Sequence, residues 1–397
     1  MGRKRRFGMW ERKIVSILRS IRFRPVSLVA LLCIAVSPVS CSTRRVAFSC
    51  NDMAPSILVP ANRGGIVDGR GRFREIFRAV LAARSPRAET GKLFDDSSTL
   101  WRLRGEPAAT GKPVSLGRPN PDYRIVMVPG LLAECVSKVS TVFGDARKPL
   151  ETMGYTMDYI QTAGRRGSGY NADIIGKAVM SMSAEKKIIF VTHSKGAVDT
   201  LEALVKYPAV ARRTAAVISF SGAVEGSLLA DAFPEFLLRL AHRLPLSSCA
   251  QGEDFEAVRS LRRSVRISWL AAHRLPRGVR YYSFAAFATP ENTSLLLRPF
   301  YDILARTDPL NDGMVIASDA IIPGSVLLGY PNADHYAVAM PFNGKNGALL
   351  AGLINRNDYP RAALLEAALR YVAEDLGREK GGNQTFGPPG AKGNCIF

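Results

Sequence analysis

Between Arg124 and Phe220 the chain alternates short apolar runs with helical segments, and this alternation restricts the fold more than any other feature. The segments "RIVMV", "GYTMDYIQT", "KKIIFVT" and "AAVISF" are typical of strands, whereas "NADIIGKAVMSM" and "KGAVDTLEALVKY" are typical of helices. Continuous apolar runs indicate strands covered on both faces, and strand–helix alternation indicates a parallel sheet. We therefore predict an α/β fold with a mostly parallel central sheet and helices on both faces.

The alternation is interrupted after the last of these strands. Residues 228–273 are predicted to form two helices, "LLADAFPEFLLRLAHRL" and "EDFEAVRSLRRSVRISWLAA", joined by a loop rich in Pro, Ser and Gly. The strand pattern returns at 279–287, and further helices are predicted at 293–306 and 361–376. We expect one main domain over 121–376, in which the insertion is a helical cap. Ordinary helix packing is the alternative for that insertion.

Residues 42–120 are predicted to be an N-terminal extension packed on the main domain. Within "GRFREIFRAVL" the apolar side chains recur at helical spacing, so one face of this predicted helix is apolar and the arginines lie on the other. The segment 377–397 contains six glycines in 21 residues, which favours disorder.

The first 41 residues have the layout of an export signal. A basic segment precedes the apolar run "VSLVALLCIAV", which is shorter than the roughly 20 residues of a membrane span. Cys41 follows Pro38-Val39-Ser40, which resembles the box in which bacterial lipoproteins lipidate a cysteine, although Pro38 stands where an aliphatic residue is usual. We expect export to the bacterial cell envelope with a lipid anchor on Cys41. An uncleaved signal anchor and simple secretion are the alternatives.

The formal net charge of +20 raises the question of nucleic-acid binding. Nine Lys and Arg residues and one acid, Glu11, fall within residues 1–40, so this segment alone carries +8. The remaining +12 is spread along the chain without a dense basic block or an aromatic–basic platform, which favours solubility over nucleic-acid recognition. The six cysteines show neither a CxxC pair nor metal-ligand spacing, so we expect no metal site.

Ser194 stands where a predicted strand becomes a predicted helix, in "VTHSKG". A G-x-S-x-G turn in this context raises a serine hydroxyl above the edge of the sheet, where it can act as a nucleophile. Gly196 provides the second glycine, but Thr192 replaces the first. The motif alone leaves two interpretations open, a nucleophile elbow and an ordinary strand–helix turn.

A nucleophilic serine needs a base, and the base needs an acid to orient it. The chain has four histidines. His193 adjoins the serine and is expected to point elsewhere on the tight turn, while His242 and His273 lie beside arginines in the predicted cap. His335, in "PNADHYAVAMP", is the only one in a loop between the last strand-like segment and the final helix. We therefore take His335 as the candidate base.

The candidate acid lies in the loop "RTDPLNDG", between the serine and the histidine. This loop offers Asp308 and Asp312, whereas Asp302 and Asp319 lie outside it. Most Asn-Asp-Gly triplets are turns, but the order Ser…Asp…His favours a catalytic triad.

Together these segments resemble the α/β-hydrolase superfamily and, within it, the bacterial lipases and esterases. The resemblance covers roughly residues 124–375 and is carried by "VMVPGLL", "VTHSKG", "NDGMV" and "ADHYAVA", in that order. It implies the α/β-hydrolase fold and a triad of Ser194, His335 and Asp312. Asp312 is preferred because bacterial lipases place the acid in a similar Asn-Asp-Gly segment ahead of the histidine, and 23 residues separate the two here. Asp308 is the reserve.

The same resemblance implies an oxyanion hole made of two backbone N–H groups. One belongs to Lys195, the residue after the nucleophile. The other belongs to Leu131, which follows Pro129-Gly130 where the family usually has His-Gly.

The resemblance implies a serine hydrolase that cleaves carboxylic esters, lipid esters among them, without a cofactor. Two alternatives stay open. The same triad could transfer acyl groups or cleave a thioester, or the fold could serve binding alone in a non-catalytic envelope protein.

Overall fold

The computed structural model of the protein describes residues 65–87, 91–131, 140–232, 256–342 and 352–381 of the 397. The predicted export signal with Cys41 lies outside these ranges, as do the middle of the predicted cap and most of the predicted disordered tail. Within the described ranges, no helix combines the length and the apolar character that a membrane crossing requires.

The described strands form one eight-stranded sheet in the order β1-β8-β7-β6-β5-β3-β4, with β2 paired to β8. All pairs are parallel except that of β2 with β8, which confirms the predicted mostly parallel sheet. The carboxyl ends of the parallel strands therefore share one edge, where open α/β sheets place their sites. The strands are β1 (Val67–Asp68), β2 (Leu100–Trp101), β3 (Tyr123–Val128), β4 (Thr156–Tyr159), β5 (Lys187–His193), β6 (Thr214–Phe220), β7 (Arg280–Phe284) and β8 (Val326–Pro331).

Alternate residues of the central strands face opposite sides of the sheet. In β3, Ile125 and Met127 belong to one apolar cluster, and Val126 and Val128 belong to another. Because both faces are covered, the strands contain the continuous apolar runs from which they were predicted.

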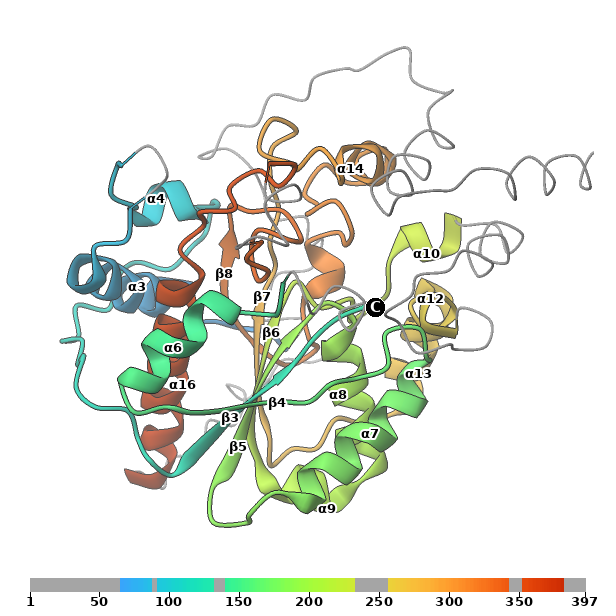
Figure 1. Cartoon of the computed structure of the whole chain (residues 1–397), viewed down its shortest axis with the longest axis horizontal. Helices are drawn as coiled ribbons and strands as arrows, with labels where there is room; N and C mark the ends of the chain where they lie inside the picture. Colours follow the sequence, from blue (N-terminus) through green and yellow to red (C-terminus); the bar gives the residue numbers. More distant parts are fainter. Residues whose placement is uncertain (1–64, 88–90, 132–139, 233–255, 343–351, 382–397) are drawn as a thin grey trace, which may run out of the picture. The chain divides into compact units, whose positions relative to one another are not determined.

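Helices cover both faces of this sheet (Figure 1). On one face α16 packs against α3 and α6, and on the other α7 packs against α8, which is followed by α9. Of these helices, α6 and α9 were not predicted. The helices of the two layers are α3 (Arg70–Arg84), α6 (Gly144–Thr152), α7 (Ser168–Ser181), α8 (Lys195–Lys206), α9 (Pro208–Arg213) and α16 (Arg361–Gly381). Shorter elements are α4 (Asp96–Thr99), α14 (Arg298–Leu304) and the 3-10 helix η1 (Ser318–Ala320).

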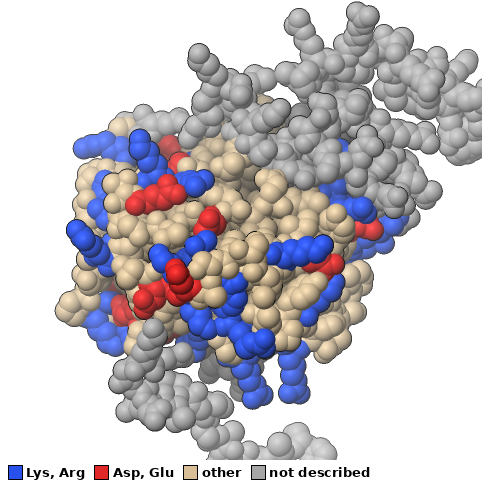
Figure 2. Space-filling model, turned by 60° about the horizontal axis from the view of Figure 1, so that its bottom comes forward, with Lys and Arg blue, Asp and Glu red and all other residues tan. Residues whose placement is uncertain are grey.

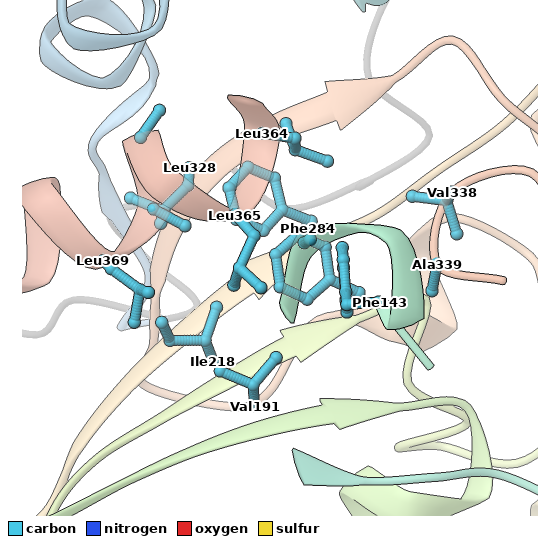
Figure 3. Close-up of a cluster of buried hydrophobic side chains, with 14 of the residues drawn as sticks. Phe143, Val191, Ile218, Phe284, Leu328, Val338, Ala339, Leu364, Leu365 and Leu369 are labelled. Atoms are coloured by element: carbon cyan, nitrogen blue, oxygen red, sulfur yellow. The ribbon is translucent and has the colours of Figure 1, made fainter. Parts of the chain in front are cut away.

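The larger apolar core lies between the sheet and the layer of α3, α6 and α16. Figure 3 shows Val191 of β5, Leu365 and Leu369 of α16, and Val338 and Ala339 of the loop after β8 in one cluster. Burying a Leu or Val side chain contributes roughly 1.5–3 kcal/mol. This core therefore also fixes the loop that carries His335.

Two features of the N-terminal part differ from the prediction. Strands β1 and β2 join the sheet at β8, so this part belongs to the main fold rather than only packing on it. Helix α3 is present, but only its later arginines, Arg78 and Arg84, are exposed. Arg72 and Arg74 are buried, and their guanidinium groups contact Glu374 and Glu106 at 2.8 and 2.9 Å.

Three helices of the predicted cap are described, namely α10 (Leu228–Ala232), α12 (Glu256–Ser260) and α13 (Arg263–Ala272). The second predicted helix is split into α12 and α13 because Arg262 is extended, with φ −62° and ψ 137°. Helix α13 is attached to α8 by an ion pair between Arg266 Nη1 and Glu202 Oε1, 2.6 Å long. This part of the insertion is docked on the main fold.

The boundaries of two helices also differ from those predicted from the sequence. The predicted helix at 293–306 is limited to α14, which begins just before Pro299 in the sequence. Helix α16 continues to Gly381, so the prediction of disorder is wrong for residues 377–381. The rest of that predicted tail lies outside the described residues.

Charged side chains are spread over the surface. Figure 2 shows Lys and Arg side chains over much of one face, with Asp and Glu side chains among them. Several exposed cations are paired, such as Arg147 with Glu151 at 2.9 Å and Lys206 with Asp173. This distribution agrees with the absence of a dense basic block in the sequence after residue 40.

Candidate active site

Ser194 lies at the sharp turn between β5 and α8, at the carboxyl edge of the sheet. Its backbone has φ 55° and ψ −128°, a conformation that is strained for any residue with a side chain. Hydrogen bonds hold this turn: the Ser194 N–H donates to Phe220 C=O, and the Ser194 C=O accepts from the N–H groups of Ala197 and Ala223, all at 3.1–3.2 Å. A strained serine on a strand–helix turn is the geometry of a nucleophile elbow.

Two glycines allow the close packing around this turn. A Cβ on Gly196 would lie 2.5 Å from Pro129 O and closer still to Val128 O. A Cβ on Gly130 would lie 2.7 Å from Ser194 Cβ. Thr192, which stands where the elbow motif has its first glycine, is fully buried, and its hydroxyl donates to Ile218 C=O at 3.2 Å. The turn therefore accommodates this departure from the motif.

His335 and Asp312 lie together, although they come from different loops. His335 Nδ1 is 2.7 Å from Asp312 Oδ2, and the His335 N–H donates to Asp312 C=O at 2.8 Å. Both side chains are buried. The other carboxylate oxygen, Asp312 Oδ1, accepts from the N–H groups of Met314 and Val315 at 2.9 and 2.7 Å. The carboxylate is thus held by its own loop on one side and faces the imidazole on the other.

Asp308, the reserve acid, has a different position. Its Oδ1 accepts from Leu310 N–H at 2.8 Å, a contact that caps its own loop. Asp319 pairs with Arg263 of α13 at 3.1 Å. The structure therefore places Asp312, and not Asp308, on the histidine.

The sequence did not predict the neighbour of His193. Its ring lies against His335, with ring centroids 4.6 Å apart. His193 Nε2 is 2.9 Å from the backbone oxygen of His335, and since a carbonyl only accepts, the ring nitrogen donates. Burial lowers the pKa of His193 well below its ordinary value, with a further contribution from His335. His193 is therefore a neutral donor inside the site.

Lys195 begins α8, so its N–H belongs to the first turn, where backbone donors have no partner within the helix. Its side chain turns away from solvent and pairs with Asp199 Oδ1 at 2.6 Å, and Asn171 donates to the other oxygen at 2.8 Å. Leu131 follows Gly130, which packs on Ser194. Lys195 thus follows the serine in the chain, and Leu131 follows a residue that packs on the serine; the catalytic roles of both stay a prediction.

A buried carboxylate that the sequence reasoning missed supports the histidine loop. Asp334 accepts hydrogen bonds from the N–H groups of Ser294, Tyr336 and Ala337 at 2.7–3.0 Å. In the sequence, its position directly before His335 was the one sign that Asp334 could support this loop. Asp334 ties the loop to the segment before α14.

A cleft of about 570 Å³ lies elsewhere in the described part of the molecule. It is lined by α3, α16 and residues 112–120, and none of the candidate catalytic residues lines it. It therefore does not serve as the acyl pocket of Ser194.

A parallel sheet with a strained serine turn at its carboxyl edge and a histidine–aspartate pair in the following loops defines the class of α/β-hydrolases. No protein-family model and no curated protein matches the chain. Among solved structures, the chain is similar to the metagenomic carboxyl esterase MGS0156, with 58% identity over 81% of this chain and 97% of that chain, and a TM-score of 0.76. The chain belongs to the α/β-hydrolase superfamily and resembles its bacterial esterases and lipases.

Two more distant solved structures are also similar. The Bacillus licheniformis lipase BlEst2 has 22% identity over 57% of this chain and 89% of that chain, with a TM-score of 0.44. The Legionella pneumophila phospholipase PlaB has 16% identity over 65% of this chain and 63% of that chain, with a TM-score of 0.42.

Proposed function

We propose that the protein hydrolyses carboxylic esters through an acyl-enzyme formed on Ser194. The observation that carries this proposal is the 2.7 Å contact between His335 Nδ1 and Asp312 Oδ2, at the sheet edge where the strained turn presents Ser194. The 58% identical relative is a carboxyl esterase by name, and we extend that activity to this chain.

Each member of the triad has one task in this reaction. His335 Nε2 takes the proton of Ser194 Oγ as Oγ attacks the ester carbonyl. When the tetrahedral intermediate collapses, His335 returns this proton to the leaving alcohol and the acyl group stays on Ser194. A water molecule then attacks the acyl-enzyme, and the same imidazole moves its proton to Ser194 as the acid is released. Asp312 holds Nδ1–H throughout and stabilises the imidazolium that forms.

Two backbone N–H groups, those of Lys195 and Leu131, would bind the oxyanion. Removal of one such donor typically costs about 3 kcal/mol in the transition state. The position of Lys195 at the N-terminus of α8 adds the partial positive charge of the helix end.

A fluorophosphonate probe on the purified protein tests the proposal, because it labels only an activated serine. We expect label on Ser194 and none after Ser194→Ala, together with loss of hydrolysis of a short p-nitrophenyl ester. Ser115→Ala is the matched control, since Ser115 also stands in an S-x-G triplet but on an exposed segment with no strand before it. A folded wild-type protein without label would instead favour a binding role.

Hydrolysis and acyl transfer differ in their products. With an acceptor alcohol present, a hydrolase still releases mostly free acid, whereas an acyltransferase forms a new ester. We propose hydrolysis, with lipid esters among the substrates. We also propose that the protein works in the bacterial cell envelope, supported by the basic and apolar segments that precede Cys41.

A further inference from the structure

The direction of the His193 side chain follows from its place at the end of β5. Side chains of a strand alternate between the two faces, so Ile189, Val191 and His193 point to the same side. On that side Ile189 and Val191 belong to the core that includes Ala337 and Val338 of the histidine loop. The ring of His193 therefore contacts this loop, and only 2% of the residue is exposed.

Within the described part of the chain, three hydrogen bonds hold His335. Two of them come from the acid loop, since Asp312 accepts from the His335 ring and from its N–H. The third comes from His193, whose Nε2–H donates to the His335 carbonyl at 2.9 Å. Of the three, only this last bond connects the histidine loop to the strand that carries Ser194.

We infer that His193 is a positioning residue, which holds the backbone of His335 at the distance from the nucleophile elbow that proton transfer requires. The inference rests on the proposed function, because it needs His335 to act as the base. His193 touches neither the substrate nor the reacting atoms in this scheme. It acts through His335, and small errors in the placement of a catalytic group are costly to the rate.

The charge state of His193 suits this role. Among the described residues, its Nδ1 has no hydrogen-bond partner, and burial keeps the ring neutral. A neutral ring adds no positive charge next to the imidazolium that forms on His335 during the reaction. A cation at this position would oppose the formation of that imidazolium.

Three variants separate hydrogen bonding from packing. His193→Phe keeps an aromatic ring against His335 but has no donor. His193→Gln loses the ring but its amide can donate from nearly the place of Nε2, whereas the shorter side chain of His193→Asn cannot reach. His273→Phe is the matched control, because His273 is an exposed histidine at the end of α13 whose Nδ1 contacts Trp269 C=O.

We expect His193→Phe and His193→Asn to lower kcat for a short ester by ten- to a hundredfold, with KM within about twofold of the wild type. His193→Gln should recover most of this loss, and His273→Phe should behave as the wild type. The rate of fluorophosphonate labelling at Ser194 should fall and recover in parallel. If His193→Phe does not fold, the His193→Gln and His193→Asn variants are compared instead, by kcat and by the rate of labelling at Ser194.

Other results would overturn the inference. Normal kcat in His193→Phe or His193→Asn would show that the donor is not needed. Equal losses in the Gln and Asn variants, tracking their melting temperatures, would mean that His193 contributes only to stability. A wild-type protein that is not labelled at Ser194 would refute the proposed function itself, whereas a labelled wild type with unaffected variants would refute the role of His193 alone.

Discussion

Asp312 binds His335 through one carboxylate oxygen and its own loop through the other. Oδ2 lies 2.7 Å from His335 Nδ1, and Oδ1 accepts from the N–H groups of Met314 and Val315. The carboxylate therefore has little freedom to rotate away from the imidazole. In the contacts that the structure describes, Asp308 binds Leu310 N–H and Asp319 pairs with Arg263 instead.

Asp312→Asn should lower kcat by about 10⁴, because the amide N–H would face Nδ1 and force the wrong histidine tautomer. Asp308→Asn keeps an oxygen that can accept from Leu310 N–H, so its activity should stay within about tenfold of the wild type. Steady-state kinetics on a short ester measures both. An inactive Asp308 variant beside an active Asp312 variant would transfer the acid role to Asp308.

Gly196→Ala should destabilise the nucleophile elbow by about 1–3 kcal/mol or more, because the new Cβ would overlap the carbonyl oxygens of Val128 and Pro129. Gly169→Ala on α7 is the matched control. There the nearest atom to a new Cβ is Glu202 Oε2 at 3.8 Å, so the change should be neutral or should stabilise the helix by up to about 1 kcal/mol. Urea unfolding reports both free energies. Equal stability in the two variants would contradict the packing argument.

The sequence predicts the sheet well because its strands are buried on both faces and form unbroken apolar runs. The resemblance to bacterial lipases, and the order Ser…Asp…His in the sequence, predict that Asp312 and His335 lie together. The contact of His193 with His335 was missed because the sequence does not show which loop covers a given side of the sheet. The burial of Arg72 was missed for another reason. Its partner Glu374 is 302 residues away, and helical periodicity carries no information about such a contact.

Arg266→Met should cost about 3 kcal/mol of stability, because it leaves the partly buried Glu202 without its cation. The double variant Arg266→Met with Glu202→Gln removes that uncompensated charge and should recover much of the loss. Arg147→Met breaks an exposed pair with Glu151 and should cost no more than about 0.5 kcal/mol. Chemical unfolding of the four proteins provides the comparison. No recovery in the double variant would indicate that the loss comes from packing against Trp269, which lies under the Arg266 guanidinium.

Asp319 should make the protein less stable as the pH rises. Burial raises the pKa of Asp319 from 3.8 to about 6, although Arg263 opposes this effect. Between these values the unfolded chain loses its proton while the folded protein keeps it, so stability declines from about pH 4 and levels off above about pH 6. The shift corresponds to roughly 3 kcal/mol.

Asp319→Asn removes this dependence and tests it. The variant should gain stability relative to the wild type between pH 4 and pH 7, and the difference should be smallest at pH 4. Melting temperatures of both proteins across this range measure the effect. A constant difference at all pH values would exclude Asp319 as its source.

Cys41 gives the last prediction, on location. One acyl chain binds membranes only marginally, whereas two or more anchor a protein stably. If Cys41 is processed as in bacterial lipoproteins, the wild-type protein should fractionate with membranes and incorporate radioactive palmitate. Cys41→Ser should lose the label, and Cys33→Ser, in the apolar run just before it, should keep it. A chain beginning at residue 42 should be soluble and still hydrolyse a short ester. Membrane attachment without label would indicate an uncleaved signal anchor, and a soluble, unlabelled wild type would mean that Cys41 carries no lipid.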